Sequence, residues 1–285
     1  MSSHTTTTPG RRGRASKPEV RAGSFSNGIS YDSIGTGPRT VVFLPGGPGV
    51  VRMAWNRIRR TLLEPLAAGG CTVWRLTRRR DMPSGHTVAD MADDVAQVID
   101  EAFDGHIDAV VGISMGGMIA QFLAARHPDV MGRVVLVSTA ATPTAATVEG
   151  ARRAGEALGH GRYTEAGAAF FEDVLPGDRL RFVRRLLGVP MGRMLAKSGN
   201  NLPDVLVETA AVMDVDTRPV LPRITAPVLL IRGDKDSDFA PDIVEETARL
   251  IPDCTLIRYE NRGHGGAAFD KRTPGHILDF INQPK

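Results

Sequence analysis

A serine between two glycines, within Gly112-Ile113-Ser114-Met115-Gly116, has surroundings that could support chemistry. An apolar run precedes it and a helix-like stretch follows it, so we expect a strand that turns sharply into a helix at Ser114. Such a turn strains the serine backbone and requires small residues two positions before and two after it. The first N–H of the helix, that of Met115, is then predicted to stabilise an oxyanion. The alternative is a glycine-rich turn with a bystander serine.

This motif and the strand and helix pattern from about Phe25 to the last helix resemble the α/β-hydrolase superfamily, whose catalytic residues run in the order serine, acid, histidine. The resemblance implies that Asp236, three residues after Gly233, is the acid and that His264, in Asn261-Arg262-Gly263-His264-Gly265, is the base. In this chemistry the imidazole takes the serine proton, and the carboxylate fixes the tautomer and stabilises the imidazolium.

Both assignments have competitors. Asp234 and Asp238 are close to Asp236, and only the family spacing favours Asp236; we expect neither neighbour to touch the imidazole. His264 stands between glycines just after a predicted strand. The remaining histidines fall in the N-terminal tail, in loops or on helices: His4, His86, His106, His127, His160 and His276.

A second oxyanion donor is expected from the loop Leu44-Pro45-Gly46-Gly47-Pro48-Gly49, because backbone N–H groups approach a substrate closely where side chains are absent. Gly47 is the preferred donor and Gly46 the alternative. The loop resembles the family's His-Gly-Gly-Pro-Gly pattern, with Pro45 in place of histidine.

A second departure from the family is the basic loop Thr77 to Ser84, where relatives often carry a glycine-rich loop. Its three arginines, Arg78, Arg79 and Arg80, either form a solvated loop, which is the default, or face the mouth of the site and attract an anionic substrate.

Short β-branched runs that alternate with amphipathic helical stretches predict an α/β fold with a mostly parallel, doubly wound sheet, and the resemblance makes it the α/β-hydrolase fold. Ile29 to Ile34 is expected to be an exposed edge strand. Six more apolar runs are expected to be central strands: Thr40 to Leu44, Thr72 to Leu76, Ile107 to Val111, Val134 to Val137, Val228 to Ile231 and Thr255 to Tyr259. Thr87 with Asp90 predicts a capping box, and Pro274 marks the start of a last helix.

The alternation fails between Thr142 and Pro222, so we expect a helical cap over 142–222 inserted into a core of 23–141 and 223–285. A cap excludes water and shapes a substrate pocket. Its large apolar residues fit either a pocket lining or plain cap core: Phe170, Phe171, Leu175, Phe182, Leu186 and Met194.

The formal net charge of +3 comes from residues 1–22, which hold five basic residues and one acidic residue; the rest of the chain has one net negative charge. This tail has almost no apolar residues, so we expect it to be disordered, with an RNA-binding or targeting arm as the alternative. No run is apolar enough for a membrane helix or signal peptide, which favours a cytoplasmic protein with no membrane partner. Because the positive charge is confined to the tail, we expect no nucleic acid partner.

The two cysteines, Cys71 and Cys254, form no metal motif, and no phosphate-binding or dinucleotide-binding glycine motif is present. We therefore expect no cofactor and no metal. The leading hypothesis is a serine hydrolase that cleaves an ester, lactone or thioester of a small to medium apolar substrate through an acyl-enzyme on Ser114. The alternatives are a lyase or carbon–carbon bond hydrolase with the same triad, and a non-catalytic ligand receptor. Homo-oligomerisation is left open.

Overall fold

A mixed sheet of eight strands organises the chain in a computed structural model, which describes residues 20–48, 56–169, 178–197 and 202–284. The strands are β1 (Val20–Ser24), β2 (Ser30–Ile34), β3 (Arg39–Leu44), β4 (Cys71–Leu76), β5 (Ala109–Ile113), β6 (Val134–Val137), β7 (Val228–Gly233) and β8 (Cys254–Tyr259). Their order is β1-β2-β4-β3-β5-β6-β7-β8, and all neighbours from β4 to β8 are parallel. The carboxyl ends of β5, β7 and β8 therefore meet at one edge of the sheet.

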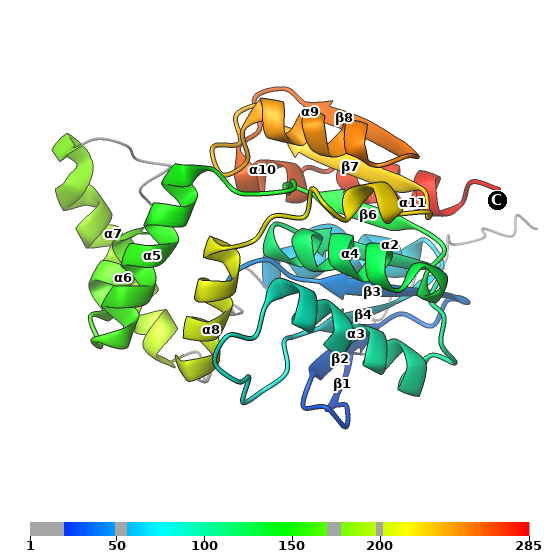
Figure 1. Cartoon of the computed structure of the whole chain (residues 1–285), viewed down its shortest axis with the longest axis horizontal. Helices are drawn as coiled ribbons and strands as arrows, with labels where there is room; N and C mark the ends of the chain where they lie inside the picture. The colour runs from blue at the N-terminus through cyan, green and yellow to red at the C-terminus, as the bar shows by residue number, and fades with distance from the viewer. Residues whose placement is uncertain (1–19, 49–55, 170–177, 198–201, 285) are drawn as a thin grey trace, which may run out of the picture.

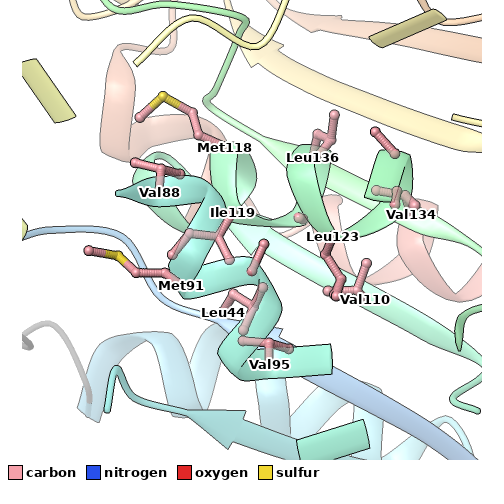
Figure 2. Packing of buried hydrophobic residues seen from close by; sticks show 14 of the residues in the cluster. Leu44, Val88, Met91, Val95, Val110, Met118, Ile119, Leu123, Val134 and Leu136 are labelled. Atoms are coloured by element: carbon pink, nitrogen blue, oxygen red, sulfur yellow. The ribbon is translucent and has the colours of Figure 1, made fainter. Parts of the chain in front are cut away.

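Successive residues of the central strands point to opposite faces of the sheet and pack into two separate hydrophobic cores. In β3, Val42 and Leu44 pack on one face, whereas Val41 and Phe43 pack on the other. The first face is covered by α3 (Val88–Ala102), α4 (Met115–Arg126) and α9 (Pro241–Leu250), and Figure 2 shows α3 and α4 side chains meeting those of the strands. The second face is covered by η1 (Arg59–Leu63), α2 (Glu64–Ala68), α10 (His264–Ala268) and α11 (Thr273–Ile281). Both faces are thus closed to water, as a doubly wound sheet requires.

The N-terminal edge of the sheet differs from the expectation. β1 pairs antiparallel with β2, so β2 is an inner strand, and residues 20–22 of the expected disordered tail belong to β1. The prediction missed β1 because Val-Arg-Ala-Gly-Ser is short, largely exposed and without a periodic apolar pattern. At the opposite edge lies β8, which was expected to be central.

Other boundaries shift by a residue or two. Ile107, expected to open a strand, makes only an isolated bridge with Met131, and β5 runs on to Ile113. The capping box of α3 is present as predicted: the Thr87 hydroxyl accepts from the Asp90 N–H, and the Asp90 carboxylate accepts from the Thr87 N–H. Pro274 lies in the first turn of α11.

The segment between β6 and β7 is helical, as expected, and contains no strand in the part that the structure describes. It forms α5 (Ala145–Gly159), α6 (Tyr163–Ala169), α7 (Arg181–Lys197) and α8 (Leu202–Met213), with short 3₁₀ turns η3 (Asp178–Leu180) and η4 (Leu221–Arg223); η2 (Pro128–Val130) precedes β6. Figure 1 shows α5, α6 and α7 grouped to one side of the sheet, with α8 between them and the core. α8 is tied to the core because Asp204 accepts from the Met82 N–H at 2.8 Å. Within the described ranges, no helix is long and apolar enough to cross a membrane.

Candidate active site

Ser114 stands on the sharp turn between β5 and α4. Its φ of 53° and ψ of −122° lie where a residue with a side chain is strained. A Cβ at Gly112 would lie 2.4 Å from the Gly116 carbonyl oxygen, and one at Gly116 would lie 2.1 Å from that of Leu44. The two flanking glycines are therefore required by close backbone approach, which explains the spacing seen in the sequence.

The imidazole of His264, which begins α10 just after β8, lies over this serine. Its Nε2 is 3.1 Å from the Ser114 Oγ, and its Nδ1 is 3.1 Å from both carboxylate oxygens of Asp236. The His264 carbonyl accepts a 2.6 Å hydrogen bond from the hydroxyl of Ser138, a residue at the end of β6. Three residues expected from the sequence are thus brought together from three different strand ends.

Asp236 is the buried member of this group, with a side chain 1% exposed. Its Oδ1 also accepts the backbone N–H groups of Asp238 at 3.0 Å and Phe239 at 3.4 Å, so the carboxylate is held by its own loop. The Phe239 ring stacks against the imidazole, with centroids 5.8 Å apart. Asp234, by contrast, is exposed. Phe239 and Ser138 carry no signal in the sequence that would have identified them.

Asp238 corrects one expectation. It was predicted not to touch the imidazole, yet its Oδ2 lies 3.3 Å from His264 Nε2, the same nitrogen that faces Ser114. The reason is local. The loop folds back so that the Asp238 N–H donates to the Asp236 carboxylate. This turn brings the Asp238 side chain to the Nε2 side of the imidazole. The signal was the Asp-x-Asp spacing itself, which the sequence presents only as an ambiguity.

The loop after β3 lies directly on the serine turn. A Cβ at Gly46 would be 3.1 Å from the Ser114 Cβ, and Gly47 has a φ of 104°, a left-handed conformation that favours glycine. Met115 is the first residue of α4, so its N–H has no acceptor within the helix. The two predicted sources of oxyanion donors therefore border the same serine.

The side chain of Arg78 holds the loop after β3 in place. It is buried, unlike the solvated side chain expected, and its Nη2 donates to the Pro45 carbonyl at 2.7 Å. Because the C=O of Pro45 and the N–H of Gly46 belong to one trans peptide, this bond also sets the direction of that N–H. Burial lowers the pKa of the Arg78 guanidinium, and the nearby Glu208 of α8 opposes that shift. Arg80 is exposed.

The expected pocket residues of the helical insertion have mixed outcomes. The side chains of Phe182 and Leu186 are 77% and 62% exposed, so they do not line an enclosed pocket. The others, namely Phe170, Phe171, Leu175 and the side chain of Met194, lie outside the described residues.

Asp236, Asp238 and His264 also present ligand atoms within 4.8 Å of one another, a spacing that a cation could use. In this structure His264 is within hydrogen-bond distance of Asp236 and of the Ser114 hydroxyl, and Asp238 Oδ2 lies at ion-pair distance from His264 Nε2. An imidazole that lies between a buried carboxylate and a serine hydroxyl has the arrangement that proton transfer requires.

Comparison with known proteins gives a family match over most of the chain. A family model described as "Alpha/beta hydrolase family" matches residues 41–273. A pimeloyl-[acyl-carrier protein] methyl ester esterase of Neisseria meningitidis serogroup C is 33% identical over 182 residues, which cover 61% of this chain and 66% of the relative. The matched part thus spans about two thirds of that relative's length.

Solved structures share the fold. The enol-lactonase of Burkholderia xenovorans LB400 superposes with a TM-score of 0.67 at 22% identity, covering 90% of this chain and 98% of that one. A thermophilic esterase of Thermogutta terrifontis gives a TM-score of 0.65 at 21% identity, covering 93% and 97%. At these identities the likeness concerns the fold alone.

Proposed function

The chain belongs to the alpha/beta hydrolase family, and we propose that it is a serine hydrolase that cleaves an ester, lactone or thioester of a small to medium apolar molecule. The observation that carries the proposal is the position of His264, with Nε2 3.1 Å from the Ser114 Oγ and Nδ1 3.1 Å from the Asp236 carboxylate. A serine hydroxyl is a weak nucleophile until a base within hydrogen-bond reach takes its proton.

In the proposed reaction Ser114 Oγ attacks the substrate carbonyl while its proton passes to His264 Nε2. The imidazolium continues to donate its Nδ1–H to Asp236, and the negative charge of this carboxylate stabilises the ring. The ring then gives its Nε2 proton to the leaving oxygen or sulfur. Water, deprotonated by the same nitrogen, attacks the acyl-enzyme; the Nε2 proton then passes to Ser114 Oγ as the acid leaves, which restores the hydroxyl and the neutral imidazole. Asp236 stays ionised throughout.

The negative oxygen of each tetrahedral intermediate would be held by the N–H of Met115 and by an N–H of the Gly46–Gly47 segment. Fixed donors of this kind are worth about 10²- to 10³-fold each in turnover. The hydrogen bond from Arg78 to the Pro45 carbonyl supports Gly46 as a donor, because it holds the Pro45–Gly46 peptide in one orientation before substrate binds.

The choice of a carboxylic ester draws on a relative in sequence, which is a methyl ester esterase. The helices α5 to α8, inserted between β6 and β7, are proposed to act as the cap that excludes water from the acyl pocket.

A panel of nitrophenyl esters of increasing acyl length, simple lactones and acyl thioesters tests this function. We expect turnover on at least one class, and its loss in Ser114→Ala with folding unchanged. Turnover that survives in Ser114→Ala would refute the acyl-enzyme route.

Two other functions use the same geometry. A carbon–carbon bond hydrolase or lyase would be inert toward all three substrate classes while reacting with β-diketone-type compounds. A ligand receptor would show ligand-induced stabilisation without turnover. No contact of the described residues favours either over ester cleavage.

A further inference from the structure

The carboxylate of Asp238 contacts the nitrogen of His264 that the proposed reaction uses. We propose that Asp238 stabilises the imidazolium form of His264 at Nε2 and thereby sets the pH at which Ser114 becomes activated. The effect on catalysis rests on the proposed function. The contact does not: Asp238 Oδ2 lies 3.3 Å from His264 Nε2 whether or not the protein turns over a substrate.

The neutral and the protonated imidazole interact with the Asp238 carboxylate in opposite ways. When the ring is neutral, Nδ1–H is donated to Asp236, so Nε2 carries a lone pair that accepts from the Ser114 hydroxyl. A carboxylate oxygen beside that lone pair has no proton to share and is repelled. In the imidazolium, Nε2–H becomes a donor, and Asp238 gains a charge-assisted contact. The contact thus favours the form that cannot act as a base.

The backbone of Asp238 is held on both sides, which keeps its side chain beside the ring. Its N–H donates to Asp236 Oδ1 at 3.0 Å, and its carbonyl accepts from the Thr144 N–H at 2.9 Å, one residue before α5 begins. Phe239, the next residue, is buried against the imidazole. The Asp238 side chain is 22% exposed, so water weakens its interaction with the ring without abolishing it.

Two carboxylates contact the ring, Asp236 at Nδ1 and Asp238 at Nε2. Asp236 faces Nδ1, Ser114 and Ser138 contribute neutral hydroxyls, and Phe239 is apolar. The basic residue of the histidine loop, Arg262, is paired with Asp270 at 2.8 Å. Lys235, on the acid loop, is exposed.

The proposal predicts the direction in which the pH–activity profile moves. An opposite charge in contact favours the protonated imidazole, so removing Asp238 lets the ring lose its proton at lower pH. The acidic limb of kcat/KM should move to lower pH by about one unit, the lower end of the range for such contacts, because the side chain is partly solvated. Relative to its own plateau, the variant is then up to about tenfold more active than wild type at a pH on the wild-type acidic limb.

The variants are Asp238→Asn and Asp238→Ala, compared with Asp234→Asn. The asparagine amide can donate to the neutral Nε2 and compete with Ser114, so Asp238→Ala is the cleaner removal of charge. Asp234→Asn removes one negative charge from the same loop at an exposed position. It therefore controls for the long-range effect of the loop's net charge on the imidazole. All profiles are measured with one activated ester in buffers of constant ionic strength that contain a chelator.

A second readout titrates the His264 ring directly by NMR in a Ser114→Ala background, with and without Asp238→Ala. We expect its midpoint to fall by about one pH unit on removal of Asp238. An unmoved midpoint, or an equal shift in Asp234→Asn, would overturn the proposal. If the wild type neither turns over esters nor reacts with a fluorophosphonate, the proposed function fails, and the NMR titration still decides the role of Asp238.

Discussion

Ser114 Oγ and His264 Nε2 lie 3.1 Å apart although 150 residues separate them in the chain. The contact exists because β5 and β8 end at the same edge of a parallel sheet, with β6 and β7 between them. The strained turn places Ser114 at that edge, and the hydrogen bond from the Ser138 hydroxyl to the His264 carbonyl holds the backbone that carries the imidazole. The pair therefore depends on backbone geometry that single substitutions can test.

Gly116→Ala should prevent the close approach of α4 to the β3 loop. The new Cβ would lie 2.1 Å from the Leu44 carbonyl oxygen and 2.7 Å from that of Pro45, and neither backbone atom can move cheaply. We expect a loss of about 1–3 kcal/mol in unfolding free energy, measured by denaturant titration, together with loss of turnover.

The matched control is Gly275→Ala in α11, an exposed position with nothing within 4 Å of the added Cβ. It should raise stability by up to about 1 kcal/mol through helix propensity. Equal effects of the two substitutions would show that backbone packing at Gly116 is not special.

Asp236→Asn should reduce turnover of an activated ester by about 10⁴-fold, the loss measured in the best-studied triad. The asparagine oxygen still accepts the N–H groups of Asp238 and Phe239, so the loop should fold as before. Asp234→Asn should retain activity. A crippled Asp234→Asn variant with an active Asp236→Asn variant would place the acid elsewhere on this loop.

The sequence carried enough information to predict the serine turn. Gly112 and Gly116 are present because backbone atoms occupy the space of their side chains, and such steric needs leave a visible spacing. The capping box of Thr87 and Asp90 was predictable for a similar reason, since both partners are three residues apart.

Features that depend on three-dimensional folding were not predictable. Asp238 reaches the imidazole through the path of its loop, and Arg78 is buried by the contact of the β4–α3 loop with Pro45 and α8. β1 is held by pairing with β2 and not by its own composition. Each is a tertiary effect that no local pattern assigns; for Asp238 the Asp-x-Asp spacing left only an ambiguity with Asp236.

Stability in acid should reflect Asp270, which joins the histidine loop to α11. Hydrogen bonds from Arg272, and then from Arg262, hold the pKa of this carboxyl well below its usual range, and its side chain is 1% exposed. A depressed folded pKa gives stability that is complete above the unfolded value of about 4 and is lost as the pH falls below it.

We therefore expect Asp270→Asn to lower Tm at neutral pH, with the gap to wild type closing as the pH falls from about 5 to about 2. Asp253→Asn, in the exposed turn before β8, serves as the control and should follow wild type. A gap that is constant with pH would rule out the ionised Asp270 as its source.

Removal of residues 1–19 should leave ester turnover unchanged, because the proposed catalytic side chains follow β5, β7 and β8. Removal of residues 1–24 also deletes β1, leaves β2 without its outer partner and should lower Tm, measured by calorimetry. A well-folded chain starting at Val20 that has lost turnover would assign the basic tail a role in the site.

The central claim, that Ser114 is the nucleophile, is tested most directly by treating the protein with a fluorophosphonate and mapping the adduct by peptide mass spectrometry. The account predicts one adduct per chain, on Ser114, which forms with the wild type, is absent in Ser114→Ala and forms slowly in His264→Ala. An adduct on a different serine, or none on the folded wild-type protein, would contradict it.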